Sequence, residues 1–277
     1  MISSSFDGFR GEETEQYPVN RIADGDREGT LSSKVDSMHD ESSMTEIDWT
    51  ASLDPQRISR SGPRVGPGRM LKFLRAHRRV DRTKAGRRKL RLFACACCRR
   101  FWSSLSDESR EALEIAERYA DGDASRKDLG YAWRISLRQY DRQPRTANGI
   151  AGHVVEASAM TAAALVSMVS YSVVADQMQQ LEELSNEESR QAAIIDDLFG
   201  NPFRKTGVEA AFQFARVDSI RASAEQIYQS QHFGELSAIG MLLEQAGCTD
   251  SDILAHCHQS QHFRGCWLID ALRGIQS

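Results

Sequence analysis

The stretch Leu90-Arg-Leu-Phe-Ala-Cys-Ala-Cys-Cys-Arg-Arg-Phe-Trp102 spaces its apolar side chains as an α-helix does. Successive helical residues are turned by about 100°, so one face of this segment gathers a stripe of apolar residues: Leu90, Phe93, Ala94, Cys97, Phe101 and Leu105. A stripe of this width is stable only when other helices cover it. The segment therefore predicts a core helix in which Cys97 is buried.

Helical signals continue on both sides of this segment. Ser106 precedes two acidic residues and an apolar repeat that Gly122 ends, which is the pattern of a capped helix. Ser125 and Thr249 mark further helix starts, and an alanine-rich helix is expected from Ala151 to Leu184. Alternating β-branched residues are scarce. The sequence predicts an all-α fold, a multi-helix bundle of short helices with one long alanine-rich helix.

Composition divides the chain into three parts. Residues 1–43 are rich in Ser, Gly, Asp and Glu, which predicts a disordered acidic leader. A helical sequence pattern begins after Met44, with Thr45 as the predicted N-cap. Residues 54–69 are expected to form a loop because of their prolines and glycines. The proline at 202 suggests an N-terminal helical bundle over 44–200 and a C-terminal helical subdomain over 201–277, packed on it.

Several features indicate a cytoplasmic protein. The chain has 277 residues, a net charge of −4 and six cysteines, and its N-terminus lacks the basic and apolar regions of a secretory signal. Ala157–Ala175 carries no charge, but it contains five Ser or Thr residues and is bracketed by Glu156 and Asp176. We therefore expect a buried core helix there and no membrane partner.

Seven strings of the sequence carry a resemblance. They are the segment Leu90–Trp102, Ala116–Gly122 (AERYADG), Asp197–Phe203 (DLFGNPF), Ala224–Tyr228 (AEQIY), Glu244–Cys248 (EQAGC), Asp252–Cys257 (DILAHC) and Arg264–Asp270 (RGCWLID). In their order they resemble a large family of uncharacterised planctomycete proteins. The resemblance covers the chain from Met44 onward. It implies a compact helical domain in a bacterial cytoplasm and brings no established activity.

Two departures from the family pattern stand out. Family members typically open with Met-Thr-Glu and a nearby Trp, which Met44-Thr45-Glu46 and Trp49 resemble, so residues 1–43 form an additional leader. An arginine-rich insertion occupies residues 75–88. It belongs to a basic segment, residues 69–91, in which eleven of 23 residues are Lys or Arg.

The basic segment is a candidate nucleic-acid site. Lysine and arginine neutralise phosphates without reading sequence, so we take as candidates Arg75, Arg78, Arg79, Arg87, Arg88, Lys89 and Arg91. Internal pairing with the acidic residues of 101–128, or with the leader, is the competing interpretation. No helix-turn-helix or zinc-finger signature accompanies the segment.

Cysteine and histidine also cluster near the C-terminus, where the candidate metal ligands are Cys257, His258, His262 and Cys266. Zinc requires four such ligands in a tetrahedron. His258, His262 and Cys266 would align only on a continuous helix, which Gly265 makes doubtful, and the chain has no Cys-x-x-Cys pair. Buried thiols, Cys266 among them, are the favoured interpretation, so no metal and no cofactor are expected.

Catalytic motifs are absent from the sequence. It has no Gly-x-Ser-x-Gly elbow, His-Glu-x-x-His or phosphate-binding loop, and the adjacent Asp196 and Asp197 cannot face one site on a helix. We therefore expect no enzyme and no catalytic residues. The predicted function is a non-enzymatic binding or scaffold module with a protein partner, for which Trp49 or Trp133 would be an anchor. The alternatives are nucleic-acid association through 69–91 and a structural zinc-binding domain.

Overall fold

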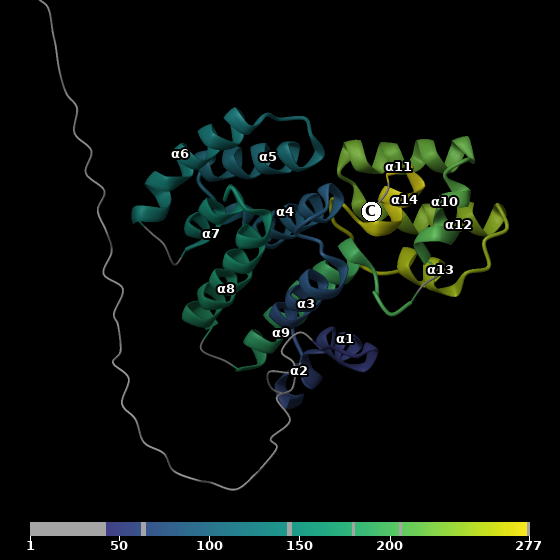
Figure 1. Cartoon of the computed structure of the whole chain (residues 1–277), viewed down its shortest axis with the longest axis horizontal. Coiled ribbons are helices and arrows are strands. Elements are labelled where there is room, and N and C mark those ends of the chain that lie inside the picture. Colours follow the sequence, from purple (N-terminus) through teal and green to yellow (C-terminus); the bar gives the residue numbers. More distant parts are fainter. Residues whose placement is uncertain (1–42, 62–64, 143–145, 179–180, 205–206, 276–277) are drawn as a thin grey trace, which may run out of the picture. The chain divides into compact units, whose positions relative to one another are not determined.

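The computed structural model describes residues 43–61, 65–142, 146–178, 181–204 and 207–275 (Figure 1). Apart from Ser43, the predicted leader lies outside these residues. Within them the chain forms α-helices with short π and 3₁₀ segments and contains no strand, which confirms the all-α prediction.

The helices of the first half follow one another through short connections. A π-helical segment, Leu74–Arg78, extends α3 directly. The α-helices are α1 (Glu46–Ser52), α2 (Pro55–Ser61), α3 (Pro67–Phe73), α4 (Lys84–Arg99), α5 (Asp107–Asp121), α6 (Arg126–Arg142), α7 (Ala147–Val154), α8 (Ala159–Met178) and α9 (Leu181–Phe199).

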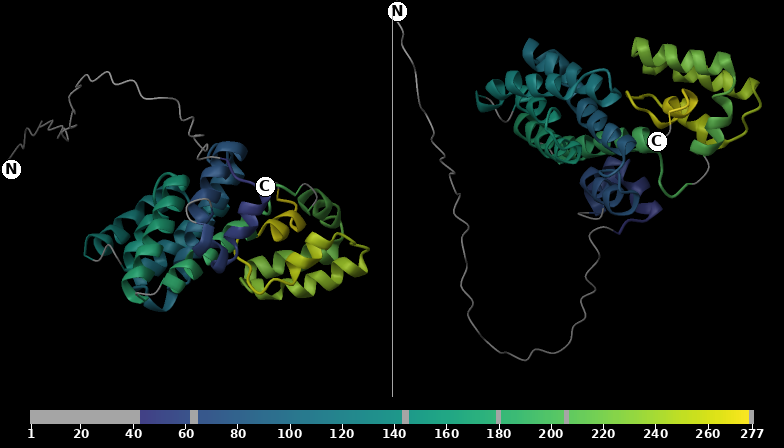
Figure 2. Two further views of the ribbon diagram at one scale, coloured as in Figure 1. Left: turned by 90° about the horizontal axis from the view of Figure 1, so that it is seen from below. Right: turned by 45° about the horizontal axis from the view of Figure 1, so that its top comes forward.

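The α-helices that follow residue 200 have at most 13 residues each. They are α10 (Gly207–Phe214), α11 (Asp218–Ser230), α12 (Leu236–Gln245), α13 (Ser251–Cys257) and α14 (Trp267–Leu272). In both views of Figure 2 these five helices lie together, and α14 contacts both α10 and α11.

Local capping signals explain several helix starts. The Thr45 hydroxyl accepts the Asp48 N–H while the Asp48 carboxylate accepts the Thr45 N–H, a reciprocal capping box at α1. Ser106 caps α5 and Gly122 ends it in the left-handed conformation. At α13 the prediction is wrong by one residue, because Asp250, rather than Thr249, accepts the free N–H groups.

Two predicted boundaries are wrong. The expected loop over 54–69 contains α2 and the start of α3, because Pro55 and Pro67 each occupy the first position of a helix, where a missing N–H costs nothing. The expected helix from Ala151 to Leu184 is interrupted after Val154, so that α8 alone is the long alanine-rich helix.

Two large apolar cores hold the described residues. The first surrounds α4, whose Leu90, Phe93 and Cys97 are fully buried as predicted, and extends from Met44 to Leu198. The second is built from residues between Ala211 and Leu272. The division into 44–200 and 201–277 stays a prediction, although its boundary falls in the interval between these cores.

The cysteines and two of the tryptophans differ in how far they are buried in these cores. All six cysteines are buried and unpaired, which includes the predicted Cys97 and Cys266. Trp49 is fully buried, whereas Trp133 is 44% exposed on α6, so only the latter is available as an anchor. Among the helices that the structure describes, none has the length and apolar character needed to cross a bilayer.

Candidate metal centre

Four side chains of metal-ligating type converge where the end of α9 meets the C-terminal helices. Asp197 lies in the last turn of α9, His256 in the last turn of α13, His262 in the following loop and Cys266 at the N-cap of α14. Each is buried, and their ligand atoms all lie within 4.8 Å of one another.

The loop between α13 and α14 is held against α9 by backbone contacts. The Phe263 N–H donates to Asp197 Oδ2 at 2.9 Å, and the Cys266 N–H donates to the Phe263 carbonyl oxygen at 2.9 Å. Gly265 makes the turn with a φ of +89°, and a Cβ there would lie 2.6 Å from Leu92 Cδ1. Glycine is therefore required both by the backbone conformation and by the close approach of α4.

The distances within the cluster resemble those of a tetrahedral centre. Asp197 Oδ1 lies 2.8 Å from His262 Nδ1 and 3.3 Å from His256 Nε2, and Cys266 Sγ lies 3.1 Å from that same nitrogen. Zinc bonds of roughly 2.0 Å to nitrogen or oxygen and 2.3 Å to sulfur give tetrahedral edges of about 3.3 to 3.5 Å. These three separations are within about 0.5 Å of a tetrahedral edge, but the four atoms spread over up to 4.8 Å, so binding one ion would also require the longest separation to shorten by up to about 1.3 Å.

Electrostatics favour an anionic Asp197. Burial alone would raise its pKa, but the hydrogen bonds and electrostatic attraction of His256 and His262 outweigh burial and hold the pKa below its usual value. Burial, with the neighbouring Asp197 carboxylate, raises the pKa of the Cys266 thiol well above its usual value. The thiol is therefore protonated in the metal-free cluster, and a bound cation would displace that proton.

The arrangement differs from a nucleophile–histidine–acid relay. Such a relay uses the two ring nitrogens of one histidine on two different partners. Here His256 Nε2 faces both Cys266 Sγ and Asp197 Oδ1. His262 Nδ1 faces Asp197, and its Nε2 is buried without a hydrogen-bond partner. Four potential ligand atoms thus lie within 4.8 Å of one another without forming such a relay.

The structure brings together half of the predicted metal ligands. His262 and Cys266 belong to the cluster, and Asp197 and His256 join them without having been predicted. Cys257 points instead toward α12, where it lies against Gly240, and His258 is exposed. The two predicted residues that fail are the two that directly follow His256, because residues one and two positions apart along a helix point in different directions.

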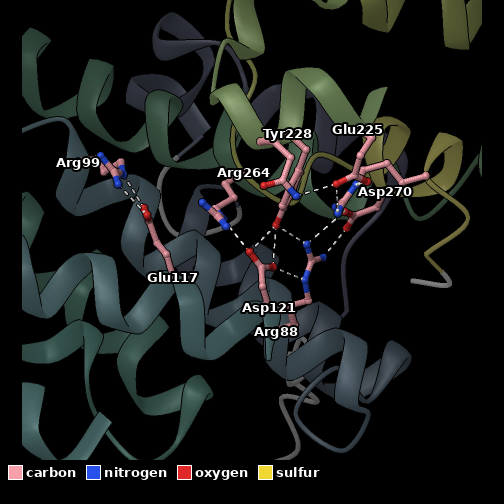
Figure 3. A network of polar contacts seen from close by, with 10 residues as sticks. Arg88, Arg99, Glu117, Asp121, Glu225, Tyr228, Arg264 and Asp270 are labelled. Atoms are coloured by element: carbon pink, nitrogen blue, oxygen red, sulfur yellow. Dashed lines mark hydrogen bonds and ion pairs between the residues drawn. The ribbon is translucent and has the colours of Figure 1, made fainter. Parts of the chain in front are cut away.

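The predicted nucleic-acid residues divide into an inner and an outer set. Arg88 belongs to the inner set and is the centre of a polar network (Figure 3). Its guanidinium donates to Asp121 and Asp270 and to the Tyr228 hydroxyl, and Arg264 also donates to Asp121. Pairing with the acidic 101–128 region, the competing interpretation, therefore holds for Arg88, and likewise for Arg99, which pairs with Glu117.

Lys89 and Arg91 complete the inner set, since both are buried. Lys89 Nζ donates to the Leu198 carbonyl oxygen at 2.6 Å. The Arg91 guanidinium donates to the carbonyl oxygens of Val154 and Glu156, just where α7 ends. Neither side chain is available to a phosphate backbone on the surface.

The outer set surrounds the turn between the π-helical segment and α4. Arg75, Arg78, Arg79 and Arg87 are exposed there. Arg79 lies in the left-handed region with a φ of +49°, and Arg75 pairs with Asp81 at 3.4 Å. These four side chains are accessible to a phosphate backbone, so nucleic-acid association through them stays a prediction.

Comparison with known proteins adds no assignment to this geometry. No protein-family model, curated protein or solved structure matches the chain. The planctomycete resemblance therefore stays a prediction, and function has to be argued from the side chains themselves.

Proposed function

We propose that this protein is a non-enzymatic helical scaffold stabilised by one structural zinc ion, which Asp197, His256, His262 and Cys266 bind. The observation that supports this most directly is the convergence of four buried ligand atoms within 4.8 Å. Structural zinc sites use four protein ligands and leave no position open, whereas catalytic sites keep one for water or substrate. The ion would connect α9 to α13 and α14.

The donor set also suits zinc by charge and by type. One carboxylate and one thiolate neutralise a divalent cation, so the occupied centre would carry no net charge into a buried environment, where an isolated charge is costly. Zinc binds well to imidazole and thiolate ligands, whereas magnesium and calcium favour oxygen ligands.

Metal analysis of the purified, untagged full chain tests the proposal. We expect about one zinc per chain, and we expect a chelator to lower the melting temperature. Free zinc at 100 times its Kd stabilises a fold by about 2.7 kcal/mol, equivalent to roughly 5 to 10 °C for a chain of this size. Absence of stoichiometric zinc, together with a melting temperature that added zinc does not change, contradicts the proposal.

A matched pair of variants locates the site. Cys266→Ala and Cys257→Ala each remove a thiol that is 0% exposed, so their packing costs are comparable. Cobalt replacing zinc should give a thiolate-to-cobalt absorption band in the wild type and in Cys257→Ala, and none in Cys266→Ala. A band that survives in folded Cys266→Ala, judged by its helical circular dichroism, places the metal elsewhere.

A second candidate function is nucleic-acid association through the outer basic residues. The observation that favours it is that the outer set, Arg75, Arg78, Arg79 and Arg87, is exposed together with Arg82 and Lys84. Asp81 is the single acidic residue between positions 69 and 91. Such a patch would contact phosphates and carry no base readout.

Salt dependence of binding tests this second candidate. With a fluorescent DNA duplex, log K should fall with log salt with a slope of about −4 to −5, as four to six phosphate contacts require. Arg79→Glu should make the negative slope shallower by about 1. Arg221→Glu on α11, which is also an exposed position, should leave the slope unchanged. A flat plot, or equal effects of the two variants, excludes this function.

A further inference from the structure

A pocket with a cavity volume of about 820 Å³ opens beside the proposed metal centre. Its lining comes from the π-helical segment, from α4, from the end of α9 and from α13 and α14. His256 contributes to its wall, and the Trp267 ring lies 4.8 Å from the His256 ring. The volume lies in the range of about 300 to 1,000 Å³ that is usual for small-molecule sites.

Lys89 brings a buried amino group to this pocket. Its side chain is 3% exposed, and its Nζ has one hydrogen bond, to the Leu198 carbonyl oxygen. No carboxylate of the residues that the structure describes lies within 4.0 Å of this nitrogen. Burial lowers the pKa of Lys89, although Asp270 and Asp197 oppose this from a longer distance. An ammonium group in such a position lacks the ion-pair partner that buried charges normally have.

Arg78 supplies a second cation, which is exposed to solvent. It lines the pocket, and its Nη2 donates to the Pro202 carbonyl oxygen at 2.9 Å. Arg204, by contrast, is already paired with Glu46 and Asp252. The pocket thus contains two basic side chains, Lys89 and Arg78, whose hydrogen bonds in the described structure go to backbone oxygens.

The remaining walls are mixed. Asp196, which accepts the Trp49 Nε1–H, and Asp252, which is paired with Arg204, line the cavity together with other polar and several apolar side chains. Leu74, Val80, Phe199 and Trp267 all line the cavity. We propose that this pocket binds a small organic anion whose carboxylate or phosphate group contacts Lys89 and Arg78 and whose apolar body lies against these four side chains. This site goes beyond the proposed zinc scaffold and does not depend on it, because neither basic residue is a metal ligand.

Fluorescence of anilinonaphthalene sulfonate, an aromatic anion, tests the pocket in the full chain. We expect one probe molecule to bind per folded chain. Phenyl phosphate or benzoate should displace it, and whichever does so at the lower concentration identifies the preferred head group. Benzyl alcohol, which has the ring without the charge, should displace it at least about tenfold less effectively, the factor that 1.4 kcal/mol represents. Equal displacement by the alcohol overturns the proposal.

Variants locate the binding to Lys89. Lys89→Met gives an unbranched apolar side chain that is one atom shorter and removes the charge, which should weaken binding of the winning competitor about 10- to 100-fold, as expected for a charged hydrogen bond. Lys84→Met, an exposed position on the same helix, is the matched control and should bind as the wild type does. Arg78→Met, whose side chain is exposed and whose loss cannot unfold a core, should also weaken binding. Wild-type affinity in folded Lys89→Met and in Arg78→Met refutes the site.

Discussion

The Arg88 guanidinium and the Asp270 carboxylate meet through two hydrogen bonds of 2.5 and 3.2 Å, although 182 positions separate them in the sequence. Asp270 is fully buried on α14, and the Arg88 side chain on α4 is 12% exposed. Arg88 also donates to Asp121 at the end of α5. One guanidinium therefore connects three helices from both halves of the chain (Figure 3).

Replacing Asp270 should destabilise the fold strongly. Asp270→Asn removes the negative charge and leaves a buried guanidinium with less compensation, which should lower the free energy of unfolding by about 3 kcal/mol. Denaturant titration monitored by helical circular dichroism measures this. Asp218→Asn, which breaks the exposed pair with Arg221, is the control and should change stability by less than about 0.5 kcal/mol. Comparable effects of the two variants would show that the buried pair has no special weight.

Gly265 should tolerate no side chain. Gly265→Ala places a methyl group 2.6 Å from Leu92 and 3.0 Å from Leu198 at a φ of +89°, so we expect a loss above about 2 kcal/mol, combining backbone strain and overpacking. Gly274→Ala has a similar φ of +78° with no atom within 4 Å and should lose only the strain, about 1 kcal/mol. Thermal melts of both proteins give the comparison, and equal losses would mean that the contact with α4 is not tight.

Helix starts that depend on neighbouring residues could be predicted from the sequence. The caps at Thr45 and Ser106 bond to residues three positions away, so the four-residue pattern contains the whole interaction. The end of α7 could not be predicted in this way. The Arg91 guanidinium, more than 60 residues upstream, binds the carbonyl oxygens that the break exposes at Val154 and Glu156. A periodicity argument contains no information on such a contact.

The candidate site shows the same division. His262 and Cys266 are close in sequence, and their residue types alone marked them as possible ligands. Asp197 lies 65 positions before His262, and its proximity depends on how α9 packs beside the loop. The adjacent Asp196 and Asp197 do point to different partners, as expected for neighbours on a helix, since Asp196 accepts the Trp49 Nε1–H at 2.7 Å. The sequence alone does not tell which of the two aspartates lies next to His262, because that depends on the fold.

Acidification should destabilise the protein through Asp121. Burial alone would raise the pKa of this carboxyl, but Arg88, Tyr228 and Arg264 outweigh burial and hold the pKa below the ordinary value of 3.8. A group with a depressed pKa in the folded state stabilises fully above its unfolded pKa, and this contribution is lost as the pH falls through the folded pKa. The free energy of unfolding should therefore decrease between about pH 4 and pH 2.

Asp121→Asn tests the origin of that pH dependence. The variant should be less stable than the wild type at pH 7 by about 2 kcal/mol, because three charged or hydroxyl donors lose a carboxylate. It should also lose less stability than the wild type between pH 4 and pH 2. Denaturant titrations at both ends of this range measure the difference. Parallel curves for the two proteins would assign the acid sensitivity to other carboxyl groups.

Slow thiol chemistry is expected at the fully buried cysteines of the folded chain. Burial raises the pKa of Cys98 to about 12 from an ordinary 9.0, and the same holds for Cys257. Because the thiolate is the reactive form, a rise of three units lowers the reactive fraction near pH 8 about 1,000-fold, before restricted access is considered. Iodoacetamide labelling followed by peptide mass spectrometry should therefore show both residues, and the fully buried Cys97, modified at least about 1,000 times more slowly in the native protein than in guanidinium chloride. Native labelling of Cys97 at the rate of a free peptide thiol would contradict the packing of α4 in the core.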